Sequence, residues 1–163
     1  MTATDFTTTM LTDRSPETVF HAINDVRGWW SEEIDGSTDI LNAEFHYHYK
    51  DVHRCSMKIT ALLPGQKVVW QVLDNHFSFT GDKTEWIGTR IVFDISETDG
   101  ATTLRFTHEG LVHACECYGV CEEAWTNYIQ NSLRSLVETG KGKPNLKEDG
   151  YNTTLAQKWQ LEA

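Results

Sequence analysis

The chain has 163 residues, the usual size of one globular domain, and 39% of them are hydrophobic while 23% are charged. With 3 Pro and 11 Gly, this composition excludes a collagen-like, low-complexity or disordered chain. The 14 Lys and Arg residues face 24 Asp and Glu residues, so the formal net charge is -10, which opposes binding to phosphate backbones and anionic lipids. We therefore expect one soluble domain, with no nucleic-acid partner and no membrane insertion.

We find neither the pattern of a membrane-spanning helix nor that of a signal peptide in this sequence. No window approaches the 18 or so apolar residues of a membrane-spanning helix, and the first residues lack the basic and apolar regions of a signal peptide. The 4 Cys are too few for a disulfide scaffold in a domain of this size. These features predict a cytoplasmic protein with reduced thiols.

The first elements are a strand and a helix. Residues 5–11 are rich in β-branched and apolar side chains, which favour a strand. Ser15 followed by Pro16 is typical of a helix start, because Ser caps the first amides and Pro fits the first turn. This helix is expected to end near Gly28, and the pair Trp29-Trp30 then indicates a second short helix or turn.

The middle of the chain predicts an antiparallel meander. Apolar and polar residues alternate with a period of two, as half-buried strands require, and Asp99-Gly100 is a strong hairpin signal. The expected strands cover residues 43–50, 56–61, 68–73, 87–95 and 101–108.

The period returns to 3.6 over residues 121–138, where one apolar stripe runs along a helix that should stop at Gly140. At roughly 1.5 Å per residue this helix spans about 27 Å, the width of a curved sheet of five or six strands. Neither element can bury its apolar face alone, so we expect one helix over one sheet. Residues 1–144 would form this domain, and residues 145–163 a polar tail with Leu155 and Trp159 at helical spacing.

Several local sequences resemble one known family. They are Ser15-Pro16-Glu17-Thr18-Val19-Phe20, Gly28-Trp29-Trp30, Leu63-Pro64, Glu85-Trp86-Ile87-Gly88-Thr89, Phe106-Thr107-His108-Glu109-Gly110-Leu111, Trp125 and Ser132-Leu133. In this order they resemble the SRPBCC (START/Bet v 1-like) superfamily, and within it the bacterial single-domain proteins named after the activator of Hsp90 ATPase. The resemblance covers roughly residues 5–144.

The resemblance implies an α+β helix-grip fold, in which a curved antiparallel β-sheet wraps around a long C-terminal α-helix and two short helices follow the first strand. It also implies an apolar cavity between sheet and helix. Members bind lipids, sterols, polyketides or other small hydrophobic molecules, some are cyclases or hydrolases, and the eukaryotic namesake stimulates a chaperone. The namesake's separate N-terminal chaperone-binding domain has no room in this sequence.

The function expected from these observations is binding of a small hydrophobic molecule between the sheet and the C-terminal helix. The tyrosines among the lining residues matter most, because buried hydroxyl groups need partners and can orient an apolar ligand. A packed core is the competing interpretation, and a cavity of roughly 300 Å³ or more would distinguish the two. The expected ligand-binding residues are Phe45, Tyr47, Tyr49, Ile59, Ile91, Phe93, Phe106, His108, Trp125, Tyr128 and Ile129.

Two other functions stay open. One is an interaction module for a chaperone of the Hsp90 type, with Trp29-Trp30 as a surface anchor, although these residues are better explained as a staple over the cavity mouth. The other is a cyclase- or hydrolase-like enzyme that uses His108 with a tyrosine. No catalytic set converges in the sequence, so we assign no catalytic residue and no cofactor.

The densest group of soft ligands is His113-x-Cys115-x-Cys117-x-x-x-Cys121. It fits a zinc site, a reactive thiol or buried structural thiols, and the last is favoured because the paired knuckles of structural zinc sites are missing. If a helix starts near Cys117, the pKa of its thiol should be lowered. His46 and His48 should lie on a solvated strand face, so no metal site is assigned.

Overall fold

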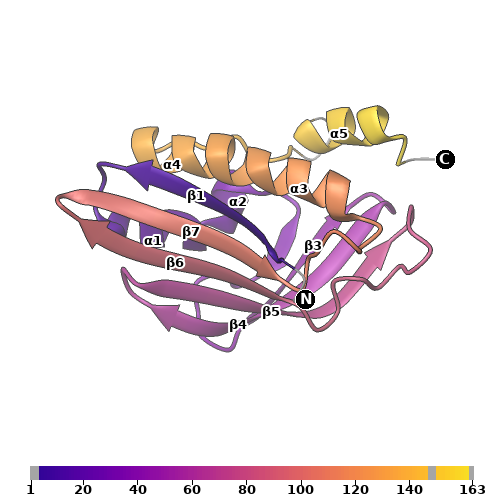
Figure 1. Ribbon diagram of the computed structural model, residues 1–163, viewed down its shortest axis with the longest axis horizontal. Helices are drawn as coiled ribbons and strands as arrows, with labels where there is room; N and C mark the ends of the chain where they lie inside the picture. Colours follow the sequence, from indigo (N-terminus) through magenta and orange to yellow (C-terminus); the bar gives the residue numbers. More distant parts are fainter. Residues whose placement is uncertain (1–3, 147–149, 162–163) are drawn as a thin grey trace.

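A curved antiparallel sheet and one long helix form the two layers of the protein, as a computed structural model describes it for residues 4–146 and 150–161 (Figure 1). The elements are β1 (Phe6–Thr12), α1 (Pro16–Asn24), α2 (Val26–Trp29), β2 (Ile34–Gly36), β3 (Glu44–Tyr49), β4 (His53–Leu63), β5 (Lys67–Phe77), β6 (Arg90–Thr98), β7 (Ala101–Glu109), α3 (Tyr118–Asn127), the π-helical segment η1 (Tyr128–Leu133), α4 (Arg134–Thr139) and α5 (Tyr151–Trp159).

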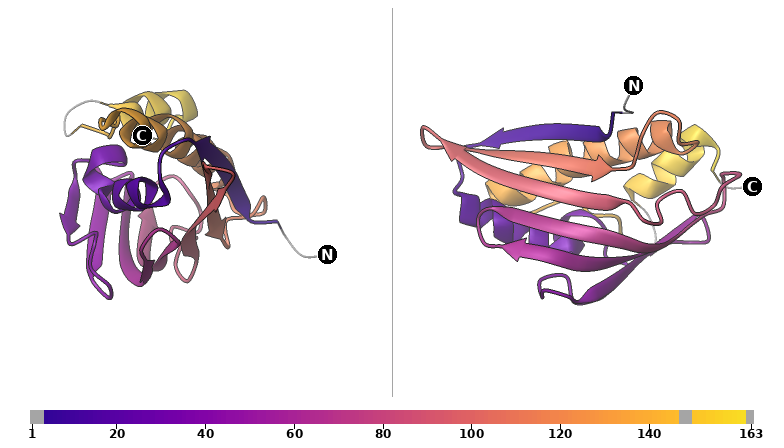
Figure 2. Two further views of the ribbon diagram at one scale, coloured as in Figure 1. Left: turned by 90° about the vertical axis from the view of Figure 1, so that its left-hand side faces the viewer. Right: turned by 60° about the horizontal axis from the view of Figure 1, so that its bottom comes forward.

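The strands pair in the order β1-β7-β6-β5-β4-β3-β2, and every pairing is antiparallel. The sheet curves around the long helix, with α1 and α2 closing one end (Figure 2). The predicted α+β helix-grip fold is therefore confirmed. The three-residue strand β2 was not predicted, because a segment this short carries no periodic signal.

One predicted strand boundary is wrong. Residues 87–89 alternate in hydrophobicity, but β6 begins only at Arg90. The amide of Thr89 donates to the carbonyl of Trp86 at 3.0 Å, Gly88 has a positive φ of 85°, and Ile87 is 45% exposed. These residues form a turn, because only glycine adopts this left-handed conformation without steric cost. The predicted hairpin at Asp99-Gly100 is present, with φ values of 54° and 79° that suit a type I′ turn.

The long helix is α3, η1 and α4 in continuous succession, and it ends at Gly140, as predicted, with a φ of 83°. The η1 segment brings Ser132 against α2. The Ser132 hydroxyl donates to the carbonyl of Trp29 at 2.6 Å and accepts from the amide of Lys143 at 2.8 Å. The bonds join the helix to α2 and to the chain that follows Gly140.

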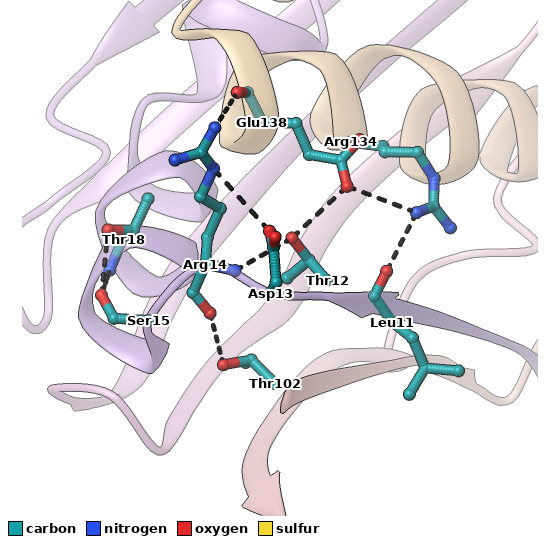
Figure 3. A network of polar contacts seen from close by, with 9 residues as sticks. All are labelled: Leu11, Thr12, Asp13, Arg14, Ser15, Thr18, Thr102, Arg134 and Glu138. Atoms are coloured by element: carbon teal, nitrogen blue, oxygen red, sulfur yellow. Dashed lines mark hydrogen bonds and ion pairs between the residues drawn. The ribbon is translucent and has the colours of Figure 1, made fainter. Parts of the chain in front are cut away.

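Polar contacts join the end of the molecule around α1 to α4, the last part of the long helix (Figure 3). The Arg14 guanidinium donates to the carbonyl of Glu138 at 2.9 Å, and Arg134 donates to the carbonyl of Leu11 at 3.0 Å. The hydroxyl of Thr102 donates to the carbonyl of Arg14 at 2.6 Å. At the start of α1, the amide of Thr18 donates to the Ser15 side chain at 3.1 Å, so the predicted cap is confirmed.

Apolar packing fills the middle of the molecule. Trp29 and Trp30 are buried, and each stacks on Trp70, with ring centroids 6.2 Å and 6.1 Å apart. Phe93 packs edge-on against Trp70 at 4.9 Å. Since both tryptophans of the pair lie in this core, they are not a surface anchor for a partner. Among the described residues, no helix is both long and apolar enough to cross a lipid bilayer.

Candidate functional site

A small apolar pocket lies at the end of the molecule opposite α1, between the sheet, α3 and α5. Its volume is about 60 Å³. This is below the roughly 300 Å³ that would distinguish a ligand cavity from a packed core, so by this criterion this conformation matches the packed-core interpretation. We call this space the pocket and define it by the lining residues named in the next two paragraphs.

The predicted ligand-binding residues divide into two groups. Four of them line the pocket: Tyr47, Tyr49, Trp125 and Tyr128. The others lie in the packed core and do not line it: Phe45, Ile59, Ile91, Phe93, Phe106, His108 and Ile129. All eleven side chains face inward, as strand alternation and the helical stripe predicted. These patterns identify the inner face, but they do not tell where along the groove a residue lies.

The remaining lining residues come from parts of the chain that sequence reasoning did not assign to the site. Trp30 and Trp86 lie in motifs that carried the family resemblance, Cys121 and Ala124 lie in the segment predicted as the long helix, and Leu155 belongs to the helical pair in the tail; these were the available signals. The residues missed are Trp30, Val52, His53, Phe77, Phe79, Trp86, Val120, Cys121, Ala124, Asn152, Leu155 and Leu161.

A buried hydrogen-bond network forms the polar wall of the pocket. The Tyr128 hydroxyl donates to the Asn152 carboxamide oxygen at 2.5 Å, and the Asn152 carboxamide nitrogen donates to the Tyr47 hydroxyl at 2.6 Å. Asn145 donates from its side chain to the Tyr128 hydroxyl and, at 3.1 Å, to the carbonyl of Trp30. The tyrosine hydroxyls thus find their partners in the segment after residue 144.

The same network fixes the start of α5. The Asn145 carboxamide oxygen accepts the amide of Asn152 at 2.7 Å, which satisfies one of the free amides in the first turn of α5. Burial raises the pKa of Tyr47 and of Tyr128 well above their ordinary values, although the hydrogen bonds from Asn152 and Asn145 oppose this shift. Both phenols are therefore neutral at physiological pH and act as hydrogen-bonding groups.

His108 is a satisfied core histidine. Its Nδ1 accepts the indole N–H of Trp125 at 3.2 Å, so the proton lies on Nε2, which donates to the Thr89 hydroxyl at 2.8 Å. That hydroxyl in turn donates to the carbonyl of Trp86 at 2.6 Å. Burial lowers the pKa of His108 from 6.5 to about 3, so the ring is neutral. Neither ring nitrogen contacts a tyrosine, and both are occupied.

His53 is a second neutral histidine, and it lies in the pocket wall. Its Nε2 donates to the carboxamide oxygen of Asn75 at 2.9 Å, and burial lowers its pKa to about 3. Its ring packs edge-on against Trp86 at 4.7 Å. The indole N–H of Trp86 is buried and has no hydrogen-bond partner among the described residues.

The cysteines near the start of α3 have a different electrostatic setting from the one predicted. The pKa of Cys117 is raised, not lowered, by the neighbouring Cys121 thiol, by burial and by the Glu85 carboxylate. Glu85 accepts the amides of Glu116 and Cys117 at 2.7 and 2.9 Å, so the helix start is already occupied by a negative charge. The expectation of a thiol activated by the helix start is therefore wrong.

The remaining metal-ligand candidates are dispersed. The His113 ring packs on Tyr118, while Cys115 points its thiol to the carbonyl of Gly110. On the outer face of the sheet, His46 bonds to the Ser56 hydroxyl at 2.7 Å and His48 pairs with Glu33 at 2.6 Å. Within the described ranges, no three His, Cys, Asp or Glu side chains are grouped as a metal ion would require.

Comparison with known proteins identifies the fold in several solved structures. The Aha1 dimer from Colwellia psychrerythraea is 24% identical with a TM-score of 0.68, and the match covers 85% of this chain and 99% of that one. A protein of Staphylococcus saprophyticus is 18% identical with a TM-score of 0.62, covering 88% of this chain and 99% of that one. CalU16 from Micromonospora echinospora is 12% identical with a TM-score of 0.57, covering 93% and 80%. At these identities the likeness concerns the fold alone.

The family assignment rests on the sequence. No curated protein matches the chain. Residues 13–138 match the family described as activator of Hsp90 ATPase homolog 1-like protein, and this segment contains both layers of the fold and the sheet side of the pocket. Asn145 and α5 lie beyond it. The chain therefore belongs to the activator of Hsp90 ATPase homolog 1-like family, within the SRPBCC superfamily.

Proposed function

We propose that the protein binds a small hydrophobic molecule in the pocket between the sheet and the C-terminal helix. The observation that carries the proposal is the combination of an apolar, aromatic-rich pocket with two tyrosine hydroxyls in one wall. Ligand sites of this kind pair a large apolar surface with a few polar groups that fix orientation. We further propose a cytoplasmic location, where the four free cysteines stay reduced.

Binding requires more room than about 60 Å³. Leu155 and Leu161 both contribute to the wall, and they come from α5 and the residues after it. Movement of this segment enlarges the pocket without disturbing the sheet or α3. The small volume is thus compatible with a binding protein that is closed when empty.

The proposed role is binding without catalysis. His108 would need a free ring nitrogen to move a proton, and its two nitrogens are bonded to Thr89 and Trp125. A variant of His108 that abolished turnover while leaving ligand binding intact would support the enzyme interpretation.

The test is native mass spectrometry of the freshly purified protein, compared with its denatured mass, and calorimetric titration with 2-naphthol as a model aromatic ligand. We expect a releasable organic adduct, or saturable binding of 2-naphthol with a dissociation constant below about 1 mM. The control is Ala124→Trp, which fills the pocket from α3 and should abolish both. Adduct and binding that survive in Ala124→Trp would place the ligand elsewhere.

A chaperone-activator role is the alternative that the family name raises. The anchor it would need at Trp29 and Trp30 is buried, so the structure favours ligand binding. The direct assay is the ATPase rate of a purified bacterial Hsp90 with and without this protein. We expect an unchanged rate, and a reproducible stimulation would favour the alternative.

A further inference from the structure

The helix α5 occupies a position that a ligand would need. It follows the residues that match the family, 13–138, and it forms the part of the pocket wall nearest the tyrosine hydroxyls. Asn152 projects from its first turn and is buried among Tyr47 and Tyr128. The side chain that completes the polar wall is therefore supplied by a segment beyond the residues that match the family.

The carboxamide of Asn152 uses both of its functions there. Its oxygen accepts from Tyr128 and its nitrogen donates to Tyr47, so one small group that is both donor and acceptor satisfies two buried hydroxyls. A hydroxyl or amide on a ligand offers the same pair of functions. An apolar ligand without such a group would leave buried hydroxyls unpaired if it displaced Asn152, which is unfavourable.

The walls also restrict the charge and shape of the molecule. Among the residues that the structure describes, no Lys, Arg, Asp or Glu lines the pocket, and the His53 ring is held neutral by burial. A charged ligand would lose its hydration without gaining a partner. Flat rings already stack in this region, Trp30 on Tyr47 at 4.3 Å and Trp86 on Trp125 at 5.7 Å, so planar aromatic molecules suit the walls.

Within the described residues, α5 has only a few polar attachments outside this network, among them a 3.4 Å hydrogen bond from the Tyr49 hydroxyl to the Thr153 hydroxyl. The exposed Lys158 ammonium pairs with the half-buried Glu123 carboxylate at 2.7 Å, and the Tyr151 hydroxyl donates to the carbonyl of Glu123 at 3.3 Å. Trp159 lies over Gly119, where an added Cβ would approach its ring to 2.9 Å, yet it remains 42% exposed. Solvent-accessible ion pairs of this type contribute little, so the buried residues Asn152, Leu155 and Ala156 are the main anchors.

We propose that α5 is an intramolecular competitor for the pocket, in which the Asn152 carboxamide takes the place of the hydroxyl or amide group of a neutral, planar aromatic ligand. This inference rests on the proposed function and adds the ligand class and the means of closure. Ligand binding displaces Asn152, and α5 moves away from α3 as the ring enters.

The experiment is calorimetric titration of the full chain with 2-naphthol, which has a neutral hydroxyl, and with 2-naphthoate, which has a carboxylate. Asn152→Ala removes the competing group, so we expect it to bind 2-naphthol at least about 10-fold more tightly than the parent chain. Gln157→Ala, an exposed position on the same helix, is the matched control and should equal the parent. The carboxylate should bind at least about 10-fold more weakly than the naphthol in every variant.

Leu155→Ala provides a second route, because it weakens the docking of α5 and leaves Asn152 in place; it too should tighten binding. Hydrogen exchange on the parent chain is a third test: because the ligand displaces α5, 2-naphthol should accelerate exchange of the amides of residues 151–159. Equal binding by the parent, Asn152→Ala and Leu155→Ala would overturn the proposal that α5 competes with the ligand. Slower hydrogen exchange in α5 on addition of 2-naphthol would do the same, and either result leaves the proposed function standing. Absence of binding in all of these chains overturns the proposed function itself.

Discussion

The two ends of the groove between sheet and helix are closed in different ways. At the end where α1 and α2 cover the sheet, Trp29 is fully buried and stacks on Trp70, and the buried Ser132 hydroxyl bonds to backbone groups. At the opposite end, the closure depends on Asn145 and Asn152, which bond to tyrosine hydroxyls. The first closure is inside the segment shared with the family, and the second lies outside it.

The difference is one of reversibility. Apolar packing of large rings is lost only when the core opens, because any separation leaves a cavity or exposes the rings to water. A hydrogen-bond closure can be exchanged, since water or a ligand can replace the departing group at small net cost. We infer that the same sheet and helix carry a permanent end and an exchangeable end, and the pocket that we propose as the ligand site lies at the exchangeable one.

The largest expected effect concerns the permanent end. Trp29→Ala removes a fully buried ring, so we expect the free energy of unfolding to fall by about 3–5 kcal/mol in urea denaturation. Trp159→Ala, at the exchangeable end, removes a ring that is 42% exposed and should cost less than about 1 kcal/mol. Similar losses for the two variants would show that the ends do not differ.

Acidification tests the buried histidine between the two ends. The pKa of His108 is about 3 in the folded protein against 6.5 ordinarily, so the unfolded chain binds the proton more readily and stability falls as pH drops from about 6.5 toward 3. Between about pH 7 and pH 5 the loss from His108 should be about 2 kcal/mol, and His53 acts with the same sign. His108→Gln should show a pH dependence shallower by this amount in urea titrations, and an unchanged slope would contradict the assignment.

Removing one hydroxyl tests the exchangeable end. Tyr128→Phe keeps the ring but leaves the Asn152 oxygen without its donor, so we expect a loss of about 1–2 kcal/mol. Tyr151→Phe is the control, because its half-buried hydroxyl makes only a 3.3 Å bond to the carbonyl of Glu123. Hydrogen exchange should show the loss in α5 before it shows in the sheet; uniform destabilisation would argue against a local closure.

The smallest expected effect is at the surface of the permanent end. Ser15→Ala removes the cap of α1, and the expected loss is about 1 kcal/mol in thermal or urea unfolding. Binding of 2-naphthol should be unchanged, since Ser15 lies at the end opposite the pocket. A change in affinity would mean that the two ends are coupled through the groove.

The local patterns predicted most of the elements, and the exceptions have physical causes. Alternation located β3, β4 and β7, and the apolar stripe located α3 through α4 together with the stop at Gly140. Alternation also suggested a strand at residues 87–89, where a positive φ at Gly88 makes a turn instead. Backbone conformation at one residue outweighs a hydrophobicity pattern, because the pattern reports which side chains are apolar and not whether the chain is extended.

The lining of the pocket was predicted only in part, for a reason visible in Tyr47 and Phe45. Both are inward residues of β3, yet Tyr47 lines the pocket and Phe45 packs on Trp70 at 5.0 Å in the core. Whether an inward residue meets the pocket or the packed core depends on how much of the groove α1 and α2 fill from one end. The sequence also predicted a low thiol pKa at Cys117, but the neighbouring Cys121 thiol, burial and the Glu85 carboxylate raise that pKa.

The sequence by itself determined the fold class, the inner face of the sheet, the long helix and the family, because periodicity and short motifs are local properties of the chain. Only the tertiary structure decided which inner residues meet open space and which groups satisfy Tyr47 and Tyr128. Those partners, Asn145 and Asn152, are far from Tyr47 in sequence and carry no pattern that marks them. Hydrogen-bond pairing across the fold depends on three-dimensional proximity, so it becomes visible only when the chain is folded.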